Sequence, residues 1–164
     1  TLRVVLEHTV DIGTATGPVK IVIPAVKPGI LTGGDLILGH SNIALVWLRA
    51  PDDSVRFNPT GSFAPVQELE LYQELYGLEA GQDYRFELTV SRERDGLLGK
   101  VIGGDSKALT LSGEEKAIGP ITPVRRFLDI STLEPGRYAV KVEYRAAGAG
   151  KLTRSRSFQI RAPR

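Results

Sequence analysis

The sequence predicts an all-β protein built as a β-sandwich, and three observations carry this prediction. Apolar and polar residues alternate with period two along several stretches, which is typical of strands with one buried face. Clusters of glycine and proline interrupt these stretches, as tight turns between short strands require. The strands that the pattern marks are unequal in length, which favours a sandwich over a closed barrel.

Two stretches show the alternation most clearly. In residues 84–91 the apolar positions are Tyr84, Phe86, Leu88 and Val90. In residues 137–145 they are Tyr138, Val140, Val142 and Tyr144. Each stretch therefore predicts a strand of an antiparallel sheet that is covered on one face.

Weaker patterns predict the remaining strands. Apolar residues alternate at positions 2–6, 19–23, 109–111, 128–130 and 158–160. Residues 43–48 are almost entirely apolar and contain Trp47, so we expect a central strand there that is buried on both faces.

The segment from residue 66 to residue 78 fits two structures. Its leucines Leu71, Leu75 and Leu78 have helical spacing, and its Glu, Leu and Gln residues favour a helix, which would form a small cap. Leu69, Leu71 and Leu75 also share one face of a strand, and tertiary context overrides propensity in sheets. We predict a strand whose outer, solvated face carries Glu68, Glu70, Tyr72, Glu74 and Tyr76.

Composition limits the class of protein. The chain has 164 residues, a net charge of +2, 41% hydrophobic and 24% charged residues, which predicts one soluble domain over residues 1–164. The absence of cysteine excludes disulfides and thiolate metal sites. The near-neutral charge argues against a nucleic-acid partner, and no apolar run is long enough for membrane insertion as a helix. Because the sequence has no Met, we expect Thr1 to be a processed end or a cut within a longer polypeptide.

Two turn sequences point to a family of sandwiches. Residues 78–84 read LEAGQDY and residues 133–138 read LEPGRY, and each opens an alternating strand with its tyrosine. Both resemble the tyrosine corner of fibronectin type III and immunoglobulin-like domains. The resemblance implies an antiparallel immunoglobulin-like β-sandwich in which Tyr84 and Tyr138 are buried and bond to backbone groups. On that basis Tyr84→Phe costs about 0.5–1.5 kcal/mol.

The order of further motifs extends this resemblance. RFNPTG at 56–61, LYQELYGL at 71–78 and LDI at 128–130 precede LEPGRY. This order is similar to the tail modules of bacterial exported or envelope proteins of the GWxTD-domain type, over roughly residues 35–162. It implies a periplasmic, cell-envelope or secreted location. The GWxTD motif itself is absent, and residues 1–30 fall outside the likeness, so we expect them to add N-terminal strands.

No catalytic, metal or cofactor site is predicted. Residues 39–43 resemble a nucleophile elbow with His40 and Ser41, but Ile43 replaces the second glycine. Gly99-Lys100 lacks the flanking residues of a phosphate loop. Neither histidine has a second His or a carboxylate at a spacing suited to zinc, with Glu7 and Asp11 near His8 as a weak exception. The acidic residues of 68–74 are interpreted as a solvated face rather than a cation site.

The C-terminal region is basic, with eight Lys or Arg and one Glu between residues 137 and 164. Arg154 and Arg156 are candidate contacts for an anionic partner, although charged strands also protect sheet edges. We expect a non-catalytic structural or protein-binding module whose partners are neighbouring domains or another protein. The alternative is a carbohydrate-binding module in which Tyr72 and Tyr76 form an exposed stacking pair.

Overall fold

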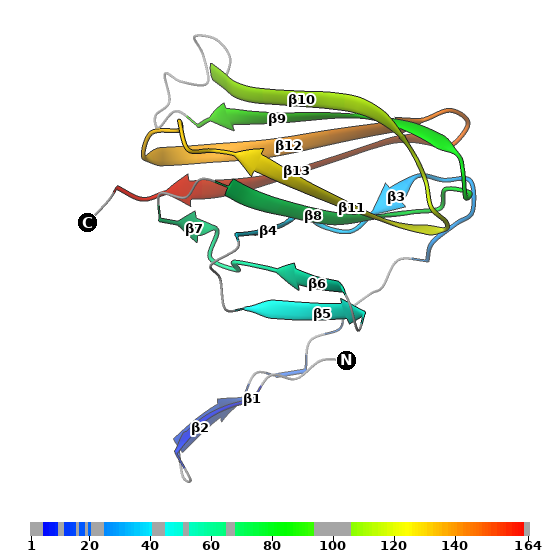
Figure 1. Cartoon of the computed structure of the whole chain (residues 1–164). Helices are drawn as coiled ribbons and strands as arrows, with labels where there is room; N and C mark the ends of the chain where they lie inside the picture. The colour runs from blue at the N-terminus through cyan, green and yellow to red at the C-terminus, as the bar shows by residue number, and fades with distance from the viewer. Residues whose placement is uncertain are drawn as a thin grey trace.

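The computed structural model describes residues 5–9, 12–15, 17–18, 20, 25–40, 45–50, 53–64, 68–93 and 106–162. All regular secondary structure in these ranges is β, so they contain no helix that could span a membrane (Figure 1). The strands are β1 (Val5–Thr9), β2 (Ile12–Ala15), β3 (Thr32–Gly33), β4 (Ile37–Gly39), β5 (Val46–Ala50), β6 (Asp53–Arg56), β7 (Ser62–Phe63), β8 (Glu68–Tyr76), β9 (Asp83–Arg92), β10 (Ser106–Lys116), β11 (Ile121–Asp129), β12 (Gly136–Ala146) and β13 (Gly150–Ile160).

Two sheets form the body of the molecule. The larger has the order β10-β9-β12-β13-β7, antiparallel except for the short parallel pair of β13 and β7. In the smaller sheet β11 pairs with one edge of β8, and β3 and β4 pair with β8 as well. The chain crosses from the first sheet to the second between β10 and β11 (Figure 1). Two hairpins, β1–β2 and β5–β6, make separate two-stranded sheets, and β1–β2 places strands within residues 1–30.

The core lies between the two main sheets. Every second residue is buried along β9 from Tyr84 to Val90 and along β12 from Tyr138 to Ala146, which confirms the strands that period-two alternation predicts. The inward side chains of these strands are Tyr84, Phe86, Leu88, Val90, Tyr138, Val140, Val142 and Tyr144. They join Leu69, Leu71 and Leu75 of β8 with Val124 and Leu128 of β11 in one cluster. Residues far apart in the sequence therefore exclude water from a common layer.

The structure corrects two expectations about individual strands. Residues 68–76 form a strand, as predicted, but the middle of its outer face is covered: Glu70 is 3% and Tyr72 is 2% exposed, whereas Glu68 is exposed as expected. The apolar run containing Trp47 belongs to the β5–β6 hairpin and is not a buried central strand. A continuous apolar run does not by itself distinguish a buried strand from an exposed apolar surface.

The two tyrosines of the turn motifs differ in their bonds. Both are buried as expected, with 3% exposure for Tyr84 and 2% for Tyr138. The Tyr138 hydroxyl donates to the backbone carbonyl of Glu134 at 2.8 Å. The Tyr84 hydroxyl instead donates to the Glu115 carboxylate at 2.6 Å, which corrects the expected bond to backbone. The cause is the β9–β10 register, which sets Glu115 directly opposite Tyr84.

Some predicted features lie outside the described residues. These are positions 2–4, 19 and 21–23 of two predicted strands, residues 43–44 of the apolar run and residues 66–67 of the segment 66–78. Ser41 of the elbow-like motif and the Gly99-Lys100 pair lie outside them as well.

Candidate functional site

The β5–β6 hairpin lies against the outer face of the smaller sheet (Figure 1). Val55 of β6 is fully buried, and its cross-strand neighbour Trp47 meets the ring of Tyr72 edge-on at 6.0 Å between ring centres. The chain leaves β6 so close to β4 that a Cβ on Gly39 would lie 2.2 Å from the carbonyl oxygen of Arg56. Glycine is therefore required at residue 39 for the hairpin to sit where it does.

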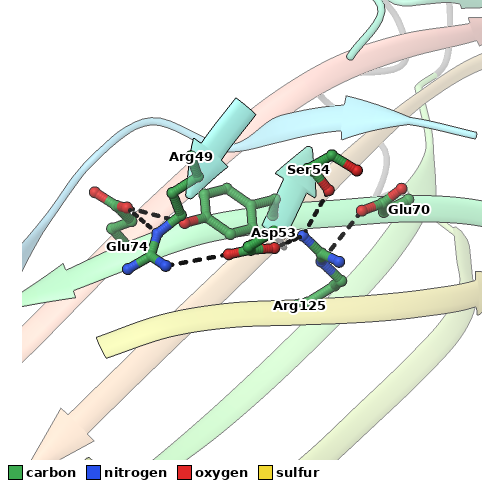
Figure 2. A network of polar contacts seen from close by, with 7 residues as sticks. Arg49, Asp53, Ser54, Glu70, Glu74 and Arg125 are labelled. Carbon is green, nitrogen blue, oxygen red and sulfur yellow. Dashed lines mark hydrogen bonds and ion pairs between the residues drawn. The ribbon is translucent and has the colours of Figure 1, made fainter. Parts of the chain in front are cut away.

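Arg49 of β5 ties the hairpin to β8 (Figure 2). Its Nε lies 2.9 Å from Oε1 of Glu74, and its Nη1 lies 3.1 Å from Oδ2 of Asp53 at the start of β6. The Arg49 side chain is 26% and the Glu74 side chain 18% exposed, so solvent screens this pair less than a surface pair.

Arg125 lies on β11 of the smaller sheet and attaches the β5–β6 hairpin to that strand (Figure 2). Its Nη2 lies 2.7 Å from Oδ1 of Asp53 and donates to the carbonyl of Ser54 at 2.9 Å. Its Nε lies 3.2 Å from Oε1 of Glu70 on β8. Five charges of alternating sign thus run across the sheet, and we call them the clamp: Glu74, Arg49, Asp53, Arg125 and Glu70.

Two tyrosine hydroxyls complete the bonds of Glu74. Tyr72 donates to Oε1 at 2.9 Å and Tyr76 donates to Oε2 at 2.8 Å. Burial and the bond to Glu74 raise the pKa of Tyr72, and they raise the pKa of Tyr76 to about 12. Burial alone would raise the pKa of Glu74, but the hydrogen bonds from Arg49, Tyr76 and Tyr72 outweigh it and hold that pKa below its ordinary value.

Glu70 at the other end of the clamp has the opposite behaviour. Its side chain is only 4% exposed and forms an ion pair with Arg125. Burial raises the pKa of Glu70, and the attraction of Arg125 and Arg56 offsets this only in part. The two ends of the clamp therefore differ. The ionised form of Glu74 is stabilised by its partners, whereas burial destabilises the ionised form of Glu70.

The hairpin that the clamp attaches carries apolar side chains that are exposed to solvent. Four consecutive residues, which we call the β5 apolar surface, are partly or largely exposed: Leu45 (51%), Val46 (44%), Trp47 (41%) and Leu48 (72%). Val46 and Leu48 share the strand face turned away from the smaller sheet, and Trp47 lies on the face that contacts Tyr72. On β11, Phe127 is 55% exposed two residues after Arg125. Neighbouring apolar residues exposed in this way differ from the scattered ones found on any surface.

In the structure, Tyr72 and Tyr76 do not form the exposed stacking pair that the carbohydrate-binding alternative requires. Tyr72 lies beneath the hairpin at 2% exposure, and its hydroxyl is bonded to Glu74. The sequence contained no signal for this, because the covering residue Trp47 comes from a separate hairpin. Tyr76 stays half-buried and shares the same carboxylate.

Arg154 and Arg156 are also used internally. Both lie on the same face of β13 as the buried residues Leu152 and Phe158. Arg154 donates to the carbonyl of Gly33 at 2.9 Å, and Arg156 donates to the carbonyl of Leu36 at 2.7 Å. These two side chains connect the larger sheet to the β3–β4 segment of the smaller one, rather than forming an open anion site.

The rest of the described chain adds little chemistry. Among the described residues, no three His, Asp or Glu side chains are grouped so that they could hold a metal ion. A shallow hollow of about 450 Å³ on the outer face of the larger sheet is lined mainly by charged side chains, including Arg85, Glu114, Glu143 and Arg145. Two of these carboxylates are already in ion pairs, Glu114 with Arg85 and Glu143 with Arg145.

Comparison with known proteins identifies no family. No family model and no curated protein matches the chain. Among solved structures it is similar to the soluble domain of PmoD from Methylocystis sp. ATCC 49242 (Rockwell), at 10% identity and a TM-score of 0.41 over 76% of this chain and 88% of that one. It is also similar to the alkylpurine DNA glycosylase AlkC of Pseudomonas fluorescens bound to DNA containing an abasic site analog. There the identity is 17% and the TM-score 0.44, over 80% of this chain and only 30% of the glycosylase. With both TM-scores below 0.5, neither likeness bears on function.

Proposed function

We propose that this chain is a non-catalytic, protein-binding β-sandwich module, and that the β5 apolar surface is its contact with a neighbouring domain or another protein. The observation that carries the proposal is the exposure of Val46 and Leu48, which share the face of β5 opposite to Trp47, on a hairpin that the clamp fixes in place. The partly exposed Leu45 and Trp47 lie beside them in the chain. Exposed contiguous apolar patches bordered by polar groups mark sites of protein association. A fixed hairpin also loses little conformational freedom on binding, which favours affinity.

The proposal includes the family relation and location that the sequence motifs imply. The immunoglobulin-like part of this proposal is supported by the chain crossing between sheets after β10 and by the bond from Tyr138 to Glu134. The exported or envelope location is proposed from the sequence motifs alone. The carbohydrate-binding alternative loses its support, because the stacking pair that it needs includes the buried Tyr72.

Site-specific cross-linking tests the protein-binding role. A photo-reactive amino acid is placed at Leu48 in the protein as its source cells make it, and a matched probe is placed at Ser155, which is exposed on the larger sheet. We expect the probe at residue 48 to give one dominant protein adduct and the probe at residue 155 to give none. Adding Val46→Asp to the chain with the probe at 48 is expected to abolish the adduct.

Two results would contradict the proposal. One is an adduct of equal yield from position 155, which would mean non-specific collision. The other is an adduct that survives Val46→Asp, because a charge in the centre of an apolar contact leaves an ion desolvated without a partner.

A further inference from the structure

Strand β10 has one long edge without a partner among the described strands. It lies at the end of the larger sheet and pairs there only with β9 (Figure 1). At the opposite edge of that sheet, β7 pairs with the last two residues of β13, and the Arg154 and Arg156 side chains of β13 bond to the β3–β4 segment. β11 at the edge of the smaller sheet contains Pro123, which has no N–H to donate. The 11 residues of β10 contain no proline, so each has a backbone N–H that can donate to a strand, and β9 is their partner strand among the described ones.

Leu111 makes this edge apolar at its centre. It lies opposite Leu88 in the β9–β10 register and so points to the same face of the sheet, toward the core. Leu88 is fully buried, yet Leu111 is 39% exposed, because the smaller sheet does not cover the outer strand there. A strand added beside β10 would bury this side chain.

We propose that β10 pairs antiparallel with β10 of a second copy of the chain, with a two-fold axis at Leu111. Residues that face each other in an antiparallel pair point to the same side of the sheet, which restricts the registers available. In this register Leu111 faces Leu111 of the second copy, and Thr110 faces Ser112. Leu109 faces Gly113, which has no side chain to obstruct it.

The charges of β10 are complementary to themselves in this register. A bulge at residue 108 places Lys107 opposite Ser91, on the outer face of the sheet. In the new β10–β10 pair, residue 108 is again left without a facing residue. Lys107 therefore lies opposite Glu114 of the second copy. The Glu114 side chain is 53% exposed and thus accessible, although Arg85 lies 3.1 Å from it within one copy. Two-fold symmetry forms this Lys–Glu pair twice, and this self-complementarity identifies a second copy as the occupant.

This association is independent of the proposed protein-binding function, because it uses the edge of the larger sheet and leaves the β5 apolar surface free. The chain contains no cysteine, so a single introduced cysteine reports on its own copy across the axis. Leu111→Cys is expected to form a disulfide-linked dimer of twice 17.8 kDa under mild oxidation, since facing residues in an antiparallel pair have Cα atoms about 4.5–5.5 Å apart, within the span of a disulfide. Ser155→Cys is the control and is expected to remain monomeric.

A charge exchange tests the register without covalent chemistry. By sedimentation equilibrium, Lys107→Glu and Glu114→Lys are each expected to weaken the dimer roughly tenfold. The double variant is expected to return to the wild-type dissociation constant, since it restores opposite charges across the axis. The proposal is overturned if the full chain stays monomeric, if Leu111→Cys cross-links no faster than Ser155→Cys, or if the double variant is weaker than both single variants.

Discussion

At the residue scale, Glu70 and Glu74 show how two carboxylates on one face of β8 acquire opposite energetic roles. Glu74 accepts bonds from Arg49, Tyr72 and Tyr76, all of which favour its ionised form. Glu70 is more deeply buried and has an ion pair with Arg125 at 3.2 Å. The sequence places both on one strand face but contains no information on which residues reach them.

The same substitution, glutamate to glutamine, is expected to change the free energy of unfolding differently at Glu74 and at Glu70. Glu74→Gln is expected to lower the free energy of unfolding at pH 7 by about 1.5–3 kcal/mol, the usual worth of hydrogen bonds to a charged group. Because the folded-state pKa of Glu74 is lowered, its contribution is present above the unfolded-state pKa and is lost as pH falls through the folded one. The difference between wild type and Glu74→Gln in urea titrations should therefore shrink on acidification.

Glu70→Gln is the matched control. The pKa of Glu70 is raised, so the folded state favours its protonated form and becomes relatively more stable as pH falls through that raised pKa. Glutamine mimics the protonated acid, so Glu70→Gln is expected to be as stable as wild type or more stable at pH 7. Equal losses for both variants would contradict the difference between the two sites.

At the scale of elements, the sequence predicted strands well and their surroundings poorly. β9 and β12 follow directly from alternation, because each has one face in the core and one in solvent. β8 was predictable from its leucines, but its polar face is covered by a hairpin that comes earlier in the chain. Whether such a face meets water or another segment depends on docking between distant segments, which periodicity does not report.

The bonds of Asp53 lead to a prediction about the local stability of the β5–β6 hairpin. It is the only member of the clamp that bonds to both arginines, so Asp53→Asn weakens both ends of the attachment at once. We expect amide hydrogen exchange at Trp47 and Val55 to accelerate roughly tenfold through local opening. Exchange at Leu88 in β9 should stay unchanged. Uniform acceleration throughout the chain, or none in the hairpin, would refute the clamp as the cause.

At the scale of the whole molecule, the basic C-terminal region joins the two sheets. One signal for this was present in the sequence: Leu152, Arg154, Arg156 and Phe158 have the same parity and so share a strand face. An arginine on a core-facing position is expected to find acceptors there. The acceptors themselves, the carbonyls of Gly33 and Leu36, were not predictable, because they lie in the β3–β4 segment, far away in the sequence.

Arg156→Ala separates a structural role from an anion-binding one. The substitution removes the bond to the Leu36 carbonyl and is expected to lower the free energy of unfolding by about 1.5–3 kcal/mol. Lys141→Ala, on the exposed outer face of β12, removes the same charge and is expected to change stability by less than about 0.5 kcal/mol. Retention on an anionic matrix at low salt should fall equally for both, since each loses one positive charge. A larger loss of retention for Arg156→Ala with unchanged stability would instead make this residue part of an anion-binding surface.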